Sequence, residues 1–137
     1  MSSWLQHEKD EILNSPPEIF KKLHLDFTLK TLISIEEVLI NTVNLENFDN
    51  PENKRTLDFI NTYIGETAIK ESDNQCRWAI DLENDYEGIT RYFFLYYILS
   101  KDEKSGLVPN SRLRFALNKK IGSTIFNYVS KKIDLFK

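Results

Sequence analysis

A change of hydrophobic period in the middle of the chain constrains the fold more than any other feature of this sequence. In residues 76–82, Cys76 and Trp78 begin an alternation of apolar with polar or small residues, which is the period of a half-buried β-strand. A turn at residues 83–88 follows, and residues 89–99 are then mostly apolar at consecutive positions. Such a run predicts a central strand covered on both faces, or a strand whose outer face meets a partner.

The chain before these strands follows a helical period instead. Apolar residues recur there at three- and four-residue spacing, and Pro51 suits the first turn of a helix. Asp26 or Thr28 suits the cap of the helix that contains Leu32. The predicted helices cover about residues 4–13, a short proline-led stretch at 16–23, 28–43 and 50–70.

The chain after the strands is helical as well. Leu113 and Leu117 begin a four-residue repeat of apolar positions that extends to Ile133. The repeat is typical of one long helix, or of two helices in which Gly122 ends the first and Ser123 caps the second, and we favour two. The sequence therefore predicts an α+β fold over residues 1–137 as a single domain. It would have N-terminal helices, a small antiparallel sheet around residues 76–99, and C-terminal helices packed on that sheet.

The composition indicates a cytoplasmic protein. A lone cysteine, Cys76, excludes an internal disulfide and fits a reducing compartment. The N-terminus becomes polar and acidic before any apolar run develops, unlike a secretory signal. The longest apolar run, residues 92–99, is too short for a transmembrane helix, which takes roughly 20 residues.

Charge is distributed unevenly along the chain. The net charge is −3, yet residues 1–88 hold 18 acidic and 8 basic residues, whereas residues 89–137 hold 3 acidic and 10 basic ones. If the fold keeps the two parts separate, one face is acidic and another is basic, which favours partners of complementary charge. If the fold interleaves them, the charges neutralise each other.

Gly65 stands inside the predicted helix 50–70, where glycine costs roughly 1 kcal/mol relative to alanine. A glycine in such a place indicates close approach by another group, and the ring of Trp78 is the candidate. Glu66, beside it, could approach Arg77 or Arg91. We interpret Gly65, Glu66 and Trp78 as structural residues.

Other candidate chemistry has a simpler structural interpretation. His7 and Glu11 are four residues apart, as zinc ligands on a helix would be, but a glutamate stands where the zinc motif has its second histidine, so a solvated helix end explains them better. Cys76 lies at an inward strand position, which indicates a small buried side chain and not a nucleophile. No catalytic residue, metal or cofactor is predicted.

The C-terminal part combines basic residues with aromatic ones, a composition that can bind single-stranded nucleic acid. The sequence pI of about 5.4 argues against this function, and the aromatic residues fall in phase with core positions. We therefore expect no nucleic-acid binding. The basic residues are Arg91, Arg112, Arg114, Lys119, Lys120, Lys131 and Lys132, and the aromatic ones are Tyr92, Tyr96, Tyr97, Phe115, Phe126 and Tyr128.

Four short motifs occur in a recognisable order: "LDFTLKTL" at 25–32, "YIGE" at 63–66, "RWAIDL" at 77–82 and "VPNSRLRFAL" at 108–117. Over roughly residues 23–130 this order resembles small bacterial cytosolic proteins, some of which are similar to immunity proteins of polymorphic or contact-dependent toxin systems. The resemblance implies a non-enzymatic domain that binds and neutralises a cognate toxin, and it implies no catalytic residues.

In that interpretation the acidic segment 71–87 would face a basic toxin domain, although a solvated loop explains it too. An alternative function is an intracellular adaptor or a self-associating structural protein that uses the aromatic strand 92–99 as its interface. A small enzyme with a carboxylate pair is a third possibility. The candidate partner-binding residues are Glu71, Asp73, Asp81, Glu83, Asp85, Tyr86 and Glu87.

Overall fold

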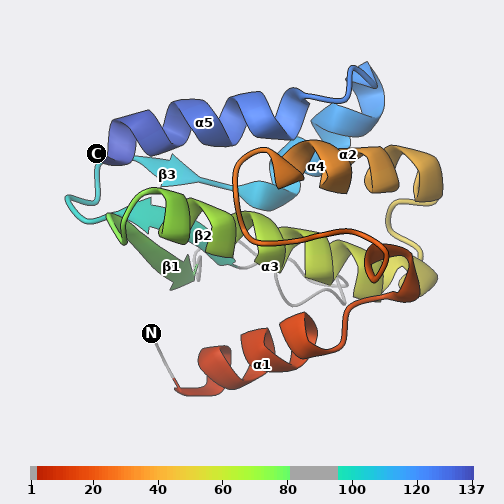
Figure 1. Ribbon diagram of the computed structural model, residues 1–137, viewed down its shortest axis with the longest axis horizontal. Helices are drawn as coiled ribbons and strands as arrows, with labels where there is room; N and C mark the ends of the chain where they lie inside the picture. Colours follow the sequence, from red (N-terminus) through yellow and green to blue (C-terminus); the bar gives the residue numbers. More distant parts are fainter. Residues whose placement is uncertain (1–2, 81–95) are drawn as a thin grey trace.

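A computed structural model of the chain describes residues 3–80 and 96–137, which form an α+β fold as the sequence predicts (Figure 1). The candidate residues Asp81, Glu83, Asp85, Tyr86 and Glu87 lie outside the described residues. The helices are α1 (Ser3–Asn14), α2 (Thr31–Thr42), α3 (Lys54–Glu71), α4 (Pro109–Lys119) and α5 (Thr124–Phe136), with 3-10 turns η1 (Glu18–Phe20) and η2 (Pro51–Asn53). The strands are β1 (Cys76–Ile80), β2 (Tyr96–Ser100) and β3 (Gly106–Leu107).

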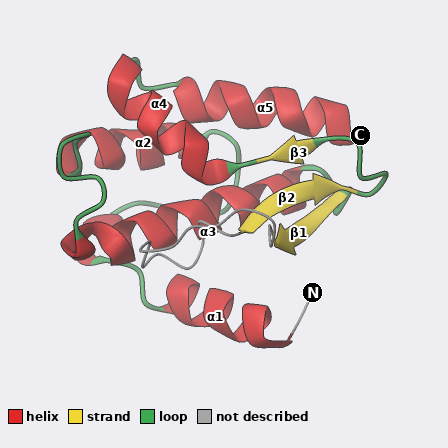
Figure 2. Ribbon diagram, turned by 180° about the vertical axis from the view of Figure 1, so that it is seen from behind, coloured by secondary structure: helices red, strands yellow, loops and turns green. Residues whose placement is uncertain are grey.

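The described strands form an antiparallel sheet in the order β1-β2-β3 (Figure 2). Trp78 pairs with Ile98, and both are buried, whereas Arg77 on the opposite face of β1 is exposed. The predicted alternation is therefore confirmed for the described part of the first strand. The two-residue strand β3 was not predicted, because so short a segment shows no periodicity.

Helix α3 lies at the centre of the fold, between α1 on one side and α4 and α5 on the other (Figures 1 and 2). It packs against β1 and β2, while α5 packs against β3. Most of its residues from Leu57 to Ala68 are buried, so its apolar stripe is wider than that of a surface helix. Because α3 separates them, α1 and α5 lie on opposite sides of the molecule.

Two N-terminal predictions need correction. Helix α2 begins at Thr31 and not at Thr28, because Asp26 Oδ1 accepts hydrogen bonds from the Thr28 N–H and hydroxyl and holds Thr28 in a turn. The Tyr63 hydroxyl also binds there, at 2.9 Å from the Phe27 nitrogen and 2.6 Å from the Thr31 hydroxyl oxygen. The short helix predicted over residues 16–23 is a single 3-10 turn.

The C-terminal repeat divides into two helices, as we favoured. Lys120 adopts a left-handed conformation (φ 54°) and ends α4, and Gly122 (φ 85°) continues the turn. Ser123 occupies the cap position of α5, but its side chain makes no capping bond, so that part of the prediction is wrong. The fully buried Glu36 of α2 replaces it, with its carboxylate oxygens 2.7 Å from the Ile125 nitrogen and 3.2 Å from the Thr124 nitrogen.

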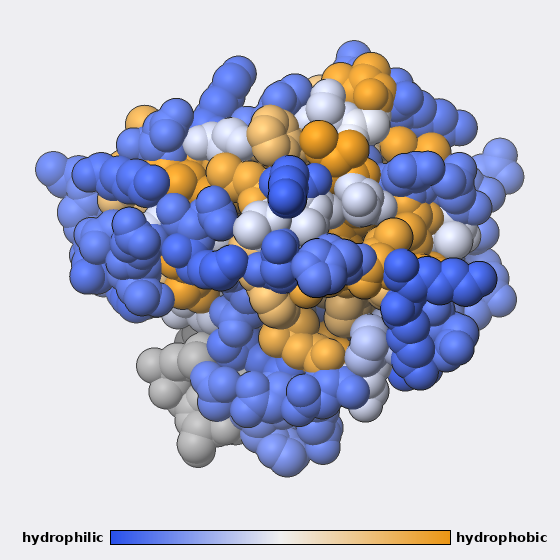
Figure 3. Space-filling view, in the orientation of Figure 1, coloured by the Kyte–Doolittle hydropathy of each residue, from blue (hydrophilic) through white to orange (hydrophobic). Residues whose placement is uncertain are grey.

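Hydrophobic side chains reach the surface in several areas of the face shown in Figure 3, including two at helix ends. One lies just above α1, and an apolar pocket of about 340 Å³ opens between the end of α1, η1 and α3, lined in part by Leu13, Phe20 and Phe59. The other lies over the turn between α4 and α5, where Ile121 is 64% exposed.

Candidate functional site

Gly65 and Trp78 meet as the sequence predicts. A β-carbon added at Gly65 would overlap the ring carbons Cζ2 and Cη2 of Trp78. The indole ring thus lies directly against the backbone of α3, and only glycine leaves room for it. This contact fixes β1 on α3 and explains why a central helix contains glycine.

Glu66 joins three elements through its two carboxylate oxygens. Oε1 lies 2.9 Å from Nζ of Lys9 on α1, and Oε2 accepts the indole N–H of Trp78 at 3.1 Å. The Lys9 side chain is 4% exposed and that of Glu66 is 23% exposed, so water competes little for this pair. With its oxygens bound in this way, Glu66 holds α1 and β1 against α3.

The predicted pairing of Glu66 with Arg77 needs correction. Arg77 lies on the opposite face of β1 and pairs with Glu103 at 3.0 Å. Arg91 lies outside the described residues. The cation that binds Glu66 is Lys9, which lies 57 residues away in the chain, so no local sequence pattern could have identified it.

The candidate residues of segment 71–87 that the structure describes lie at the end of α3. Glu71 is the last residue of this helix and is partly buried, and Asp73 is exposed in the turn that leads to β1, with a left-handed φ of 55°. No described cation forms an ion pair with either of them. These two side chains are thus available to a partner.

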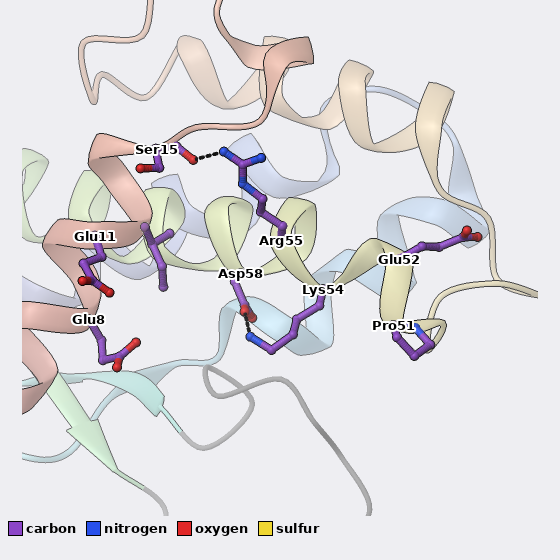
Figure 4. Close-up of a pocket in the computed structure, with 9 residues that line it drawn as sticks. Glu8, Glu11, Ser15, Pro51, Glu52, Lys54, Arg55 and Asp58 are labelled. Carbon is purple, nitrogen blue, oxygen red and sulfur yellow. Dashed lines mark hydrogen bonds and ion pairs between the residues drawn. The ribbon is translucent and has the colours of Figure 1, made fainter.

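A second acidic feature, which the sequence did not reveal, lies near the other end of α3. A cleft of about 550 Å³ opens between α1 and the start of α3 (Figure 4). From Asp58 to Glu71 the helix rises about 20 Å, so the cleft and the 71–73 turn are separate acidic surfaces. The cleft is lined by Glu8, Glu11, Ile12 and Ser15 from the first helix and its end, and by Pro51, Glu52, Lys54, Arg55 and Asp58.

The two cations of the cleft are bound by the protein itself. Lys54 Nζ lies 2.8 Å from Oδ2 of the buried Asp58, and Arg55 donates to the Ser15 carbonyl oxygen at 2.8 Å (Figure 4). Glu8 and Glu52, in contrast, have no hydrogen-bond or ion-pair partner among the described residues. Glu8 lies on the α1 side of the cleft, and Glu52 lies at its far edge with its carboxylate directed away from α1 (Figure 4), and the described residues neutralise neither charge.

The other residues considered for catalysis or metal binding, Cys76, His7 and Glu11, lie in surroundings that indicate a structural role. Cys76 is buried, its sulfur lies 3.3 Å from the Ser72 hydroxyl, and burial raises the pKa of the thiol above its ordinary value. A raised thiol pKa lowers the population of the nucleophilic thiolate at neutral pH. His7 Nε2 lies 3.2 Å from Glu11 on the exposed side of α1. Within residues 3–80 and 96–137, no three His, Cys, Asp or Glu side chains gather as a metal site would require.

Comparisons with known proteins leave the family open. No protein-family model, curated protein or solved structure matches this chain. Among the helices of the described residues, none has both the length and the apolar character needed to cross a membrane.

Proposed function

We propose that this protein is a non-enzymatic, cytoplasmic protein-binding domain, and that it acts as an immunity protein that neutralises a basic toxin domain. The observation that carries the proposal is the acidic cleft between α1 and α3, where Glu8 and Glu52 have no cationic partner among the described residues. The motif order from residue 25 to residue 117 supports it through its resemblance to immunity proteins.

A basic partner surface would place lysine or arginine side chains in this cleft. Complementary charge of this kind raises the rate of association and excludes partners of the wrong sign. Glu71 and Asp73, at the far end of α3, form a second acidic surface that is separate from the cleft. An inhibitor that occludes a toxin needs no catalytic groups of its own, only a stable and complementary face.

The experiment that tests the proposal is co-expression with the product of the adjacent gene, scored by rescue of growth and by the mass of the purified complex. Growth rescue together with a 1:1 complex supports the immunity function. A homo-oligomer without a heteromeric complex would contradict it and favour the self-associating alternative.

Charge variants then locate the binding face in that complex. If the cleft binds, the double variant Glu8→Gln/Glu52→Gln slows association at least about threefold at low salt, because steering depends on charge. The pair Glu71→Gln/Asp73→Asn tests the other acidic surface in the same assay. Asp134→Asn, an exposed acid on α5 at the opposite side of the molecule, is the matched control and leaves the rate unchanged.

A further inference from the structure

The face formed by α4 and α5 carries an alternating row of cations and aromatic rings, which we call the cation–aromatic ladder. The Arg112 guanidinium carbon lies 4.1 Å from the ring centroid of Tyr128 and 5.3 Å from that of Phe115. Lys119 Nζ lies 5.6 Å from the Phe115 centroid, and Lys132 Nζ lies 5.9 Å from that of Tyr128. The ladder therefore comprises Lys132, Tyr128, Arg112, Phe115 and Lys119.

Helical spacing produces this row. Arg112, Phe115 and Lys119 are separated by three and four residues, so they lie along one face of α4. Tyr128 and Lys132 are four residues apart on α5, which packs against α4. The prediction that the aromatic residues of this region lie in the core is therefore wrong for Phe115, which is 42% exposed.

The cations of the ladder are oriented but not neutralised. Arg112, Lys119 and Lys132 have no acidic partner among the described residues. Nε of Arg112 is itself buried, so a partner would meet the terminal nitrogens of the guanidinium. Arg114 on the same helix shows the contrast, since its terminal nitrogen lies 2.8 Å from both carboxylate oxygens of Asp49. An aromatic ring holds a guanidinium in place without supplying the acceptor that its N–H groups require.

We propose that the ladder binds an acidic segment of a protein partner, with a carboxylate of that segment on the guanidinium of Arg112. A planar guanidinium already positioned by Tyr128 fits the two oxygens of a carboxylate. Phe115 and Val108, each 42% exposed, supply apolar contact beside the charges. Arginine and aromatic residues next to exposed apolar ones form the composition enriched in the centres of protein interfaces.

The same features argue against a nucleic acid as the ligand. Stacking of bases needs open ring faces, and Arg112 already covers a face of the Tyr128 ring. The chain as a whole is acidic, with a net charge of −3, which opposes a long polyanion more than a short acidic peptide. This surface differs from the acidic cleft in position and in sign, so the inference is independent of the proposed function.

Fluorescence anisotropy of the full chain with a labelled acidic peptide tests the inference. The probe is an acetylated, amidated hexapeptide of glutamate and leucine, and the comparison peptide has glutamine at every glutamate. Arg112→Gln is expected to lower the affinity for the acidic peptide at least about tenfold, because it removes a charge-assisted, bidentate contact. Arg112→Lys, which keeps the charge but loses the planar geometry, gives an intermediate loss.

Arg77→Gln, an identical substitution on the outer face of β1, is the matched control and leaves peptide affinity unchanged. Circular dichroism verifies that each variant is folded. Equal binding of the glutamine peptide, or no saturable binding, overturns the proposal. Tighter binding of an oligothymidylate of equal charge assigns the ladder to nucleic acid. If the chain self-associates and Arg112→Gln abolishes this, the ladder binds a second copy of the chain. Binding of nucleic acid or of a second copy would each replace the proposal of an acidic protein partner.

Discussion

The acidic cleft and the cation–aromatic ladder lie on opposite sides of α3, and they hold their charged groups in different ways. In the cleft, oxygen atoms of the protein bind the cations, as the Asp58 carboxylate binds Lys54. Glu8 and Glu52, in contrast, have no partner among the described residues. In the ladder, aromatic rings hold the cations and leave them charged, as Arg112 shows.

This difference shows how one small chain keeps two surfaces of opposite sign apart. The acidic first part and the basic last part of the sequence could have neutralised each other, and contacts such as Arg114 with Asp49 do so locally. Helix α2 of the first part packs on α4 and α5, whereas the central position of α3 keeps α1 and the cleft away from α5 (Figure 1). Charge separation here follows from the packing of one helix.

The largest effect is expected where α1 and β1 are held on α3, next to the cleft. Gly65→Leu should lower the free energy of unfolding by about 1–3 kcal/mol, because the new side chain overlaps the Trp78 ring. Urea denaturation followed by circular dichroism measures the change. In a Trp78→Leu background, Gly65→Ala should instead be neutral or stabilising, because alanine favours the helix by about 1 kcal/mol. Destabilisation by Gly65→Ala in that background would contradict the packing explanation.

A smaller effect is expected at the start of α5, which supports the ladder. Glu36→Gln should lower the free energy of unfolding by about 1–2 kcal/mol, because a neutral amide accepts the Thr124 and Ile125 N–H groups less strongly than a carboxylate. Glu37→Gln, on the exposed side of the same helix, is the control and should change stability by less than about 0.5 kcal/mol. Equal urea midpoints for the two variants would exclude Glu36 as the cap of α5.

The strands, helix ends and contacts described above show how far local sequence patterns predict this fold. The alternation at Cys76 and Trp78 and the glycine at position 65 are local signals, and they gave the correct strand and the correct contact. The Gly122–Ser123 pair correctly indicated two C-terminal helices, although the first of them already ends at Lys120. The start of α2 was placed too early, because Asp26 binds Thr28 in a turn that competes with the helix.

The candidate sites depend on contacts that local patterns do not contain. The cleft joins Glu8 to Glu52 across more than forty residues, and the partner of Glu66 is Lys9 at a similar separation. Phe115 lies out of phase with the buried Leu113 and Leu117, so the helical period itself places it on the outer side of α4, contrary to the prediction that it lies in the core. Glu36 looks out of place in an apolar stripe, and that anomaly was the one sequence signal for its role as a buried cap.

The smallest effects are expected for the charges that we assign to partners. Glu52→Gln should change the free energy of unfolding by less than about 0.5 kcal/mol, because the described residues contain no partner for its carboxylate to lose.

Arg112→Gln should lower the free energy of unfolding by about 0.5–1 kcal/mol, since the variant loses only the attraction of the guanidinium to two rings. Urea midpoints measured in low and high salt test both values. A loss above about 2 kcal/mol for Arg112→Gln would show that the ladder stabilises the fold and would remove the contrast between the two surfaces.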